Sequence, residues 1–276
     1  MAKPRTSKTA AAPISSVDFP YKVERWSDLS VLIEYFSYYN GIPWLFRGES
    51  TTTFDLLPSV GRNNRKRKPT DADPDRRTPY RAVDERAVFD MFVQQARAYV
   101  TTNYSPLEWL AVAQHFGVPT RLLDWSDSLL AAAWFASRID EPVNGDGRIW
   151  VVRDVPAVDT AGIADPFKIK MPRVYRPPHL SPRLGAQGSV LMICPKPTEP
   201  PILDGEVYEI VIAKNAKGEL LKRLNACGVN RRTLFPDLQG LGEHLAWLYR
   251  RDWLAGYKTD QLALLMASSL GRRGTS

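Results

Sequence analysis

Apolar residues recur at helical spacing within the segment Ser27–Tyr39. These residues are Leu29, Leu32, Ile33 and Phe36. The spacing predicts an amphipathic helix, and Asn40-Gly41 supplies the left-handed backbone that commonly ends one. The short apolar run Ile42–Phe46 then predicts a buried strand that ends at Arg47-Gly48.

Two helices are expected in the next third of the chain. Arg81–Val100 combines acidic and basic residues with an apolar face that we assign to Val83, Val88, Phe92 and Tyr99. The sequence Ser105-Pro106-Leu107-Glu108 is a capping box with proline at the first helical position, so a second helix begins there. It runs to about Phe116, and Gly117 provides its left-handed stop.

The segment Val118–Trp125 predicts an ordered turn, after which Asp124 or Ser126 is placed to cap a further helix. That helix is apolar nearly all round, which is typical of an element at the centre of a core. Its large apolar residues are Leu129, Leu130, Trp134 and Phe135.

Short β-rich runs dominate the following part of the chain, and helical patterns return near its end. The expected strands are Gly147–Arg153, Gly188–Cys194 and Glu206–Ala213, and the expected helices are Glu219–Ala226, Asp237–Arg251 and Asp260–Leu270. This order predicts an α+β fold, with a mixed or antiparallel central sheet flanked by helices. We expect a disordered arm over residues 1–20, one domain over 21–255, and a C-terminal helix and tail over 256–276.

Composition narrows the class of protein. The chain has 276 residues, of which 44% are hydrophobic, and this is ample for a buried core. Its two cysteines indicate a reducing, cytoplasmic location, and no apolar run is long enough to cross a membrane.

The net charge of +7 favours an anionic partner. The polar, mobile loop expected over residues 61–80 holds the strongest basic run, a candidate nucleic-acid contact formed by Arg62, Arg65, Lys66, Arg67 and Lys68.

Common catalytic signatures are absent from the sequence. It has no phosphate-binding glycine loop with lysine, no dinucleotide fingerprint and no nucleophile elbow. The three histidines, His115, His179 and His244, are too scattered to predict a metal site. The chemistry must therefore come from polar residues placed within apolar surroundings.

Arg47 is the first such residue, because it ends a predicted buried strand. A buried guanidinium needs an acceptor, and its planar donors suit a phosphate or a carboxylate. Gly48 allows a ligand or a second backbone to come close. The residues leave two interpretations open, ligand binding or a structural ion pair with Asp124, Glu49 or Glu85.

The segment Gln114–Asp124 is the second place where polar residues lie within apolar surroundings. It offers an amide, an imidazole, a hydroxyl, a cation and an anion between two apolar helices, namely Gln114, His115, Thr120, Arg121 and Asp124. A local alternative is that Arg121 pairs with Asp124 and Asp124 caps the next helix. Gln187, before the strand that begins near Gly188, either binds a ligand or closes a turn.

Together these segments resemble the FRG-domain family. The matching motifs are Phe46-Arg47-Gly48, the segment from Gln114 to Trp125, the turn Ala186-Gln187-Gly188, and Leu234-Phe235-Pro236-Asp237 with Gly240-Leu241. The resemblance covers roughly residues 25–250, so the domain expected over 21–255 is an FRG domain. Members of this family look like parts of toxin or phage-defence systems.

The order of these motifs is also similar to the ADP-ribosyltransferase superfamily. This similarity implies a related fold with NAD as substrate, catalytic roles for Arg47, Gln187 and Asp124, and an NAD site formed by Arg47, Gly48, Gln114, His115, Thr120 and Arg121. Trp44, Trp125 or Phe116 would stack on a ring, and Glu49 or Glu85 are alternative sources of negative charge. The sequence departs from that superfamily in two respects: glutamine cannot act as a general base, and the Ser-Thr-Ser strand is missing.

Two functions therefore compete. One is NAD-dependent ADP-ribosyl transfer to a nucleic acid or protein, as a toxin or phage-defence effector. The other is a non-catalytic nucleic-acid or protein-binding module that uses the basic surface. If the polar cluster only holds the core together, Arg47→Ala should cost roughly 3–5 kcal/mol of stability. The sequence leaves the oligomeric state open.

Overall fold

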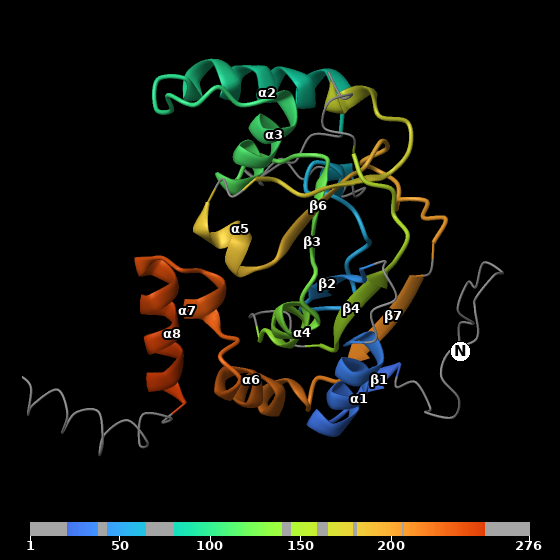
Figure 1. Ribbon diagram of the computed structural model, residues 1–276, viewed down its shortest axis with the longest axis vertical. Coiled ribbons are helices and arrows are strands. Elements are labelled where there is room, and N and C mark those ends of the chain that lie inside the picture. The colour runs from blue at the N-terminus through green and yellow to red at the C-terminus, as the bar shows by residue number, and fades with distance from the viewer. Residues whose placement is uncertain are drawn as a thin grey trace, which may run out of the picture.

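The computed structural model describes residues 21–37, 43–64, 80–139, 145–158, 165–178, 181–205 and 207–251. Within these ranges the chain forms a seven-stranded mixed sheet with helices packed against it (Figure 1). The strands are β1 (Lys22–Val23), β2 (Leu45–Glu49), β3 (Leu122–Ser126), β4 (Gly147–Val152), β5 (Arg173–Tyr175), β6 (Ser189–Ile193) and β7 (Val207–Ile212). The α+β fold with a mixed central sheet is confirmed.

The sheet has the order β1-β7-β4-β2-β3-β6-β5, and only β1 and β7 pair in parallel. β2 pairs with β4 along its whole length, and β3 does the same with β6. β2 and β3, in contrast, share the single registered pair Phe46 with Ser126. The sheet is therefore loosely joined between β2 and β3, near its middle.

The α-helices of the described residues lie between and around these strands. They are α1 (Trp26–Ser37), α2 (Ala82–Ala96), α3 (Pro106–His115), α4 (Leu129–Ser137), α5 (Pro182–Ala186), α6 (Lys217–Ala226), α7 (Arg231–Leu234) and α8 (Leu238–Arg250). Two short 3₁₀ helices, η1 (Gly61–Asn64) and η2 (Pro166–Lys168), complete the set. Helix α3 begins with the predicted capping box, and Gly117 has the expected positive φ of 87°.

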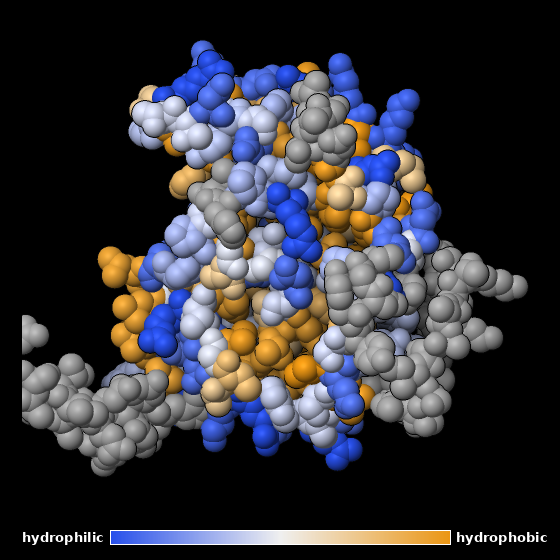
Figure 2. All heavy atoms as spheres, in the orientation of Figure 1, coloured by the Kyte–Doolittle hydropathy of each residue, from blue (hydrophilic) through white to orange (hydrophobic). Residues whose placement is uncertain are grey.

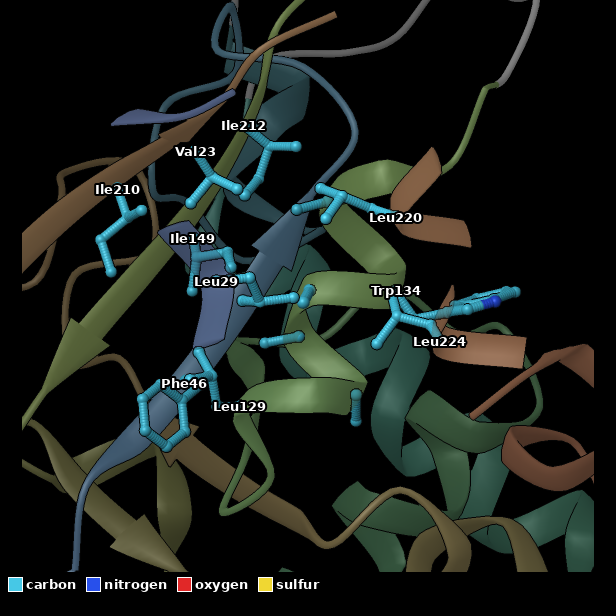
Figure 3. Packing of buried hydrophobic residues seen from close by; sticks show 14 of the residues in the cluster. Val23, Leu29, Phe46, Leu129, Trp134, Ile149, Ile210, Ile212, Leu220 and Leu224 are labelled. Atoms are coloured by element: carbon cyan, nitrogen blue, oxygen red, sulfur yellow. The ribbon is translucent and has the colours of Figure 1, made fainter. Parts of the chain in front are cut away.

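One hydrophobic cluster joins α1, α4 and α6 to the sheet. Its members include Phe46 of β2, Ile149 of β4 and Ile210 of β7, and Figure 3 shows them with Leu129 and Trp134 of α4. As its all-round apolar character predicts, α4 is almost entirely buried. A second cluster packs α2 and α3 against β3, β5 and β6.

Because Ser126 lies opposite Phe46 and side chains alternate along a strand, the side chain of Asp124 lies on the same face of the sheet as that of Phe46.

Gly48 brings β2 and α4 together. A Cβ atom added there would lie 1.9 Å from the main-chain oxygen of Ala132. Of the two uses expected for this glycine, the structure therefore shows the close approach of a second backbone.

Four expectations for local structure were wrong. The strand predicted to end at Arg47-Gly48 runs one residue further, to Glu49, and most of the predicted turn 118–125 is strand β3, because its alternating residues cover both faces of the sheet. The cap of α4 is Ser128, whose side chain accepts from the amide of Ala131. The apolar face assigned to α2 is largely exposed, and its buried residues are Glu85 and Phe89.

Several expectations lie outside the described residues. They concern the arm 1–20, the helix stop Asn40-Gly41, most of the basic loop at 65–79, His179 and the helix Asp260–Leu270. The domain limits and the disorder of the arm stay predictions.

Candidate functional site

A cleft of about 260 Å³ opens on the helix-covered face of the sheet, where β2 and β3 are loosely joined. Strands β2, β3 and β6 line its floor, and α3, α4 and α5 line its walls. Its polar lining residues are Arg47, Gln114, His115, Asp124, Ser126, Arg183, Gln187 and Ser189. The structure thus gathers residues from four distant parts of the sequence, including most of those predicted.

Arg47 bridges the loosely joined strands. Its Nη1 donates to the main-chain oxygen of Asp124 at 2.7 Å, and its Nε lies 3.2 Å from Oε1 of Glu49. Glu49 also accepts from Arg148 and from the indole of Trp150. The ion pair of Arg47 with Glu49 fits the structural alternative that the sequence left open. Arg47 also lines the cleft, so ligand binding stays a prediction.

A chain of side-chain hydrogen bonds holds Asp124. The hydroxyl of Thr120 donates to Oε1 of Gln114, and Nε2 of Gln114 donates to Oδ1 of Asp124 at 2.6 Å. Thr120 is itself fixed by hydrogen bonds with Ser59. These hydrogen bonds determine which end of the Gln114 amide faces Asp124. Within the described residues, Oδ2 of this exposed carboxylate has no hydrogen-bond partner.

His115 and Arg183 give the cleft its electrostatic character. Burial lowers the pKa of His115 below its ordinary value of 6.5, and the positive charge of Arg183 lowers it further. Burial also lowers the pKa of Arg183, while Asp124 and Asp237 act in the opposite direction. The lining therefore carries the cations Arg47 and Arg183, the anion Asp124 and a neutral imidazole at pH 7. This balance suits an anionic ligand that also has a group to meet a carboxylate.

Gln187 lines the cleft but has a structural partner. It caps α5, and its Nε2 donates to the main-chain oxygen of Leu234 at 3.0 Å. Its own main-chain oxygen accepts from the hydroxyl of Ser126 at 2.6 Å. The turn-closing interpretation of Gln187 fits these bonds, which tie α5 to β3 and α7.

Two of the predicted ligand-binding residues are buried away from the cleft lining. Thr120 is 1% exposed and acts on the site only through Gln114. Arg121 is 3% exposed and forms a two-point ion pair with Glu85, with Nη2 to Oε2 at 2.6 Å. The proposed local pair of Arg121 with Asp124 was therefore wrong. It failed because Glu85 of α2 accepts from two nitrogens of the Arg121 guanidinium, while Gln114 holds Asp124.

The aromatic residues suggested for ring stacking occupy different places. Trp44 belongs to the hydrophobic core, where the guanidinium of Arg153 lies over its ring. Trp125 is 2% exposed at the cleft wall, and Phe116 is exposed next to His115. Neither alternative carboxylate lines the cleft, since Glu49 and Glu85 are both buried in ion pairs.

Sequence reasoning missed three polar residues of the cleft. Arg183, Ser126 and Ser189 were given no role within the site from the sequence. Proline at the first position of α5 was the available signal, because it predicts a short helix that carries Arg183. Nothing in the sequence alone placed that helix beside α3.

Of the basic run, the structure describes Arg62, whose Nε donates to the main-chain oxygen of Leu57 at 2.8 Å. Arg65, Lys66, Arg67 and Lys68 lie outside the described residues, so the nucleic-acid contact stays a prediction.

The described part of the chain bears on three further kinds of site. No group of three or more His, Cys, Asp or Glu side chains there is arranged to hold a metal ion. None of the helices described combines the length and apolar character needed to span a membrane. Cys194 and Cys227 are both free thiols, and burial raises the pKa of Cys194 to about 12.

Comparison with known protein families matches the FRG domain to residues 43–144. The chain is therefore similar to the FRG-domain family over this part of its length. The matched range supplies Arg47, Gln114, His115 and Asp124 to the cleft, whereas Arg183 and Gln187 follow it. No curated protein and no solved structure gives a match.

Proposed function

We propose that the cleft binds NAD and transfers its ADP-ribosyl group to an acceptor, as the likeness to ADP-ribosyltransferases implies. The observation that carries this proposal is Asp124, an exposed carboxylate held by Gln114 in a cleft that Arg47 and Arg183 also line. A cation pair suits the pyrophosphate, and a fixed carboxylate suits a sugar that becomes positively charged.

The reaction breaks the bond between C1′ of the ribose and the nicotinamide nitrogen. The bonding electrons leave with the nitrogen, so neutral nicotinamide departs and C1′ gains oxocarbenium character. Asp124 stabilises this charge, and the acceptor forms a new bond to C1′ while its proton passes to Asp124 as general base. Arg47 and Arg183 hold the phosphates, and Gln114 orients Asp124.

In this proposal Asp124 takes the role of the catalytic carboxylate, whereas the resemblance to ADP-ribosyltransferases implies the position of Gln187 for that role. Gln187 has no acidic proton to exchange, and its amide is engaged by Leu234. Asp124 is the carboxylate that lines the cleft among the described residues. The cleft volume of about 260 Å³ lies below the range typical of whole cofactors, so it suits the nicotinamide riboside and nearby phosphate, with the adenosine end outside.

The acceptor and setting are part of the same proposal. The net charge of +7 and the basic run 62–68 favour a nucleic-acid acceptor, in keeping with a toxin or phage-defence role. A cytoplasmic location, where NAD is present and thiols stay reduced, fits the free Cys194 and Cys227. The alternative is a non-catalytic module that binds nucleic acid or protein through the same charge.

The test is incubation of the protein with NAD labelled in the adenylate phosphate, together with RNA, DNA and protein acceptors. We expect label to pass to one acceptor, with nicotinamide released in equal amount. Asp124→Asn keeps the side-chain shape and should lower transfer by about 100-fold or more. Asp127→Asn is the matched control, because Asp127 is a nearby exposed carboxylate that pairs with Arg176 outside the cleft lining. Absence of both transfer and NAD binding, with salt-dependent nucleic-acid binding instead, would favour the alternative.

A further inference from the structure

Helix α8 has one face that packs on the protein and one apolar face that is uncovered. On the packed face His244 and Leu248 are buried, and Trp247 contacts the hydrophobic cluster that joins α1, α4 and α6 to the sheet. The other face appears in Figure 2 as an apolar surface along α8. Its exposed members are Leu238, Leu241, Gly242, Leu245, Ala246 and Tyr249.

This uncovered face is a continuous stripe. Positions 238, 242, 245 and 249 are three or four residues apart, so their side chains lie above one another along the helix. Leu238 is 87% exposed, Leu245 50% and Tyr249 74%. α8 has 13 residues and is therefore about 20 Å long, and the stripe runs along all of it. Single exposed apolar residues are ordinary, but a contiguous group marks an interaction surface.

The two described glycines of α8 differ in what surrounds them. A Cβ atom at Gly240 would lie 1.9 Å from the main-chain oxygen of Phe235, so the packing of this chain requires glycine there. A Cβ atom at Gly242 would have no atom within 4 Å. Glycine within a helix is less stable than alanine, and no contact of the described chain requires it at position 242. The close approach of a second backbone would require it.

The charges of α8 indicate what kind of helix could approach. Asp237 caps the first turn and Glu243 lies in the first half, whereas Arg250 lies in the last turn. Two copies of α8 in antiparallel orientation would place the acidic half of each helix beside the basic end of the other, with their macrodipoles opposed. A parallel pair would bring like charges together. The charge pattern is therefore complementary to that of a second, antiparallel copy.

We propose that α8 packs antiparallel against α8 of a second copy of this chain, about a two-fold axis near Gly242 and Leu245. Leu238 then lies beside the partner's Tyr249, and the two backbones approach closely at Gly242. An interface centred on one helix is small, so the dimer is weak and its population depends on protein concentration. None of these residues lines the cleft that contains Arg47, so the pairing does not depend on NAD binding.

Sedimentation equilibrium of the full chain, from about 1 μM to about 500 μM, tests the pairing. We expect the average mass to rise with concentration from that of one chain toward that of two. Leu245→Glu should weaken association about tenfold or more, because it places two like charges at the centre of the interface. Met91→Glu is the matched control, since Met91 of α2 is similarly exposed, at 55%, and should leave association unchanged.

Gly242→Leu distinguishes close packing from a general effect of apolar surface. Leucine is the better helix former and has open space at this position, so the Tm of the isolated chain should rise. Association should nevertheless weaken about tenfold or more, because the new side chain holds the two backbones apart. If apolar surface alone drove association, the added leucine would strengthen it.

Disulfide cross-linking tests the orientation, in a Cys227→Ser background because Cys227 is an exposed thiol. A disulfide needs two Cα atoms within about 7 Å. Leu238→Cys and Tyr249→Cys proteins should cross-link when mixed and should not cross-link alone.

Three results would overturn the proposal. The first is a protein that stays monomeric over the whole concentration range. In that case, a large loss of Tm in Leu245→Glu would show that the same chain covers this face. The second is a dimer that both Leu245→Glu and Gly242→Leu leave intact. The third is cross-linking of Leu238→Cys with itself, which would show a parallel pair.

Discussion

The side-chain amide of Gln114 donates to the carboxylate of Asp124 at 2.6 Å, and this bond joins the last turn of α3 to the middle of β3. Thr120 fixes the orientation of the amide from the other side. The bond keeps one oxygen of Asp124 turned toward Gln114 and leaves the other to the cleft. Gln114 is thus a positioning residue in the proposed reaction.

Gln114→Glu should change how the transfer rate depends on pH. The variant places a second carboxyl group against Asp124, and two carboxyl groups in contact retain a proton at higher pH than one alone. We expect the acidic limb of the pH–rate profile for kcat to move to higher pH, with thermal stability near neutral pH little changed. A profile that coincides with that of the wild type would contradict the positioning role.

Arg47→Gln should distinguish a role of Arg47 in NAD binding from a role in the stability of the fold. Glu49 keeps Arg148 and Trp150 as partners, so the variant should lose only about 1–2 kcal/mol of stability, rather than the larger loss expected for an orphaned buried carboxylate. NAD binding should weaken by about tenfold or more. Calorimetric NAD titration and urea unfolding measure the two effects. Arg176→Gln serves as control, since Arg176 is an exposed arginine outside the cleft lining. A large stability loss with unchanged affinity would assign Arg47 a structural role.

The ion pair of Arg121 with Glu85 predicts the opposite behaviour. Both side chains are buried, and removal of one leaves the other charge uncompensated. Arg121→Ala should therefore lower the free energy of unfolding by about 3–5 kcal/mol. The double variant Arg121→Met with Glu85→Leu should recover much of this loss, because no unpaired charge remains. Chemical denaturation of the wild type, Arg121→Ala and the double variant provides the comparison, and a double variant no more stable than Arg121→Ala would refute the account.

Acidification should destabilise the protein through its two described histidines. The folded state lowers the pKa of both His115 and His244 from 6.5, mainly by burial. Their contribution to stability is complete above pH 6.5 and is lost as the pH falls through the lower folded-state pKa. We expect the Tm to fall between pH 7 and about pH 5, and to fall less in the double variant His115→Gln with His244→Gln. Equal losses in both proteins would show that other groups cause the effect.

Local signals in the sequence predicted a large part of this fold. The capping box at Ser105 placed α3, and continuous apolar composition identified α4 as a central helix. β3 was missed because Leu122–Ser126 is short and contains a polar residue at its centre, which resembles a turn. Its strand character depends on pairing with β6, which lies more than sixty residues away in the chain.

The candidate site was predicted in part for a similar reason. Arg47, Gln114, His115 and Asp124 stood out as polar groups beside apolar runs, and they do share a cleft. The partner of Arg121 could not be predicted, because Glu85 comes from a helix whose buried face was assigned wrongly. Arg183 was missed because α5 reaches the cleft only through tertiary contacts with β3 and α7.

The structure of the protein with a non-hydrolysable NAD analogue tests the central claim most directly. The proposal predicts the analogue in the cleft between α3 and α4, with phosphate oxygens about 3 Å from the guanidinium groups of Arg47 and Arg183. It also predicts the nicotinamide ribose facing the open oxygen of Asp124. An empty cleft at saturating analogue, or an analogue bound solely at another place on the protein, would contradict it.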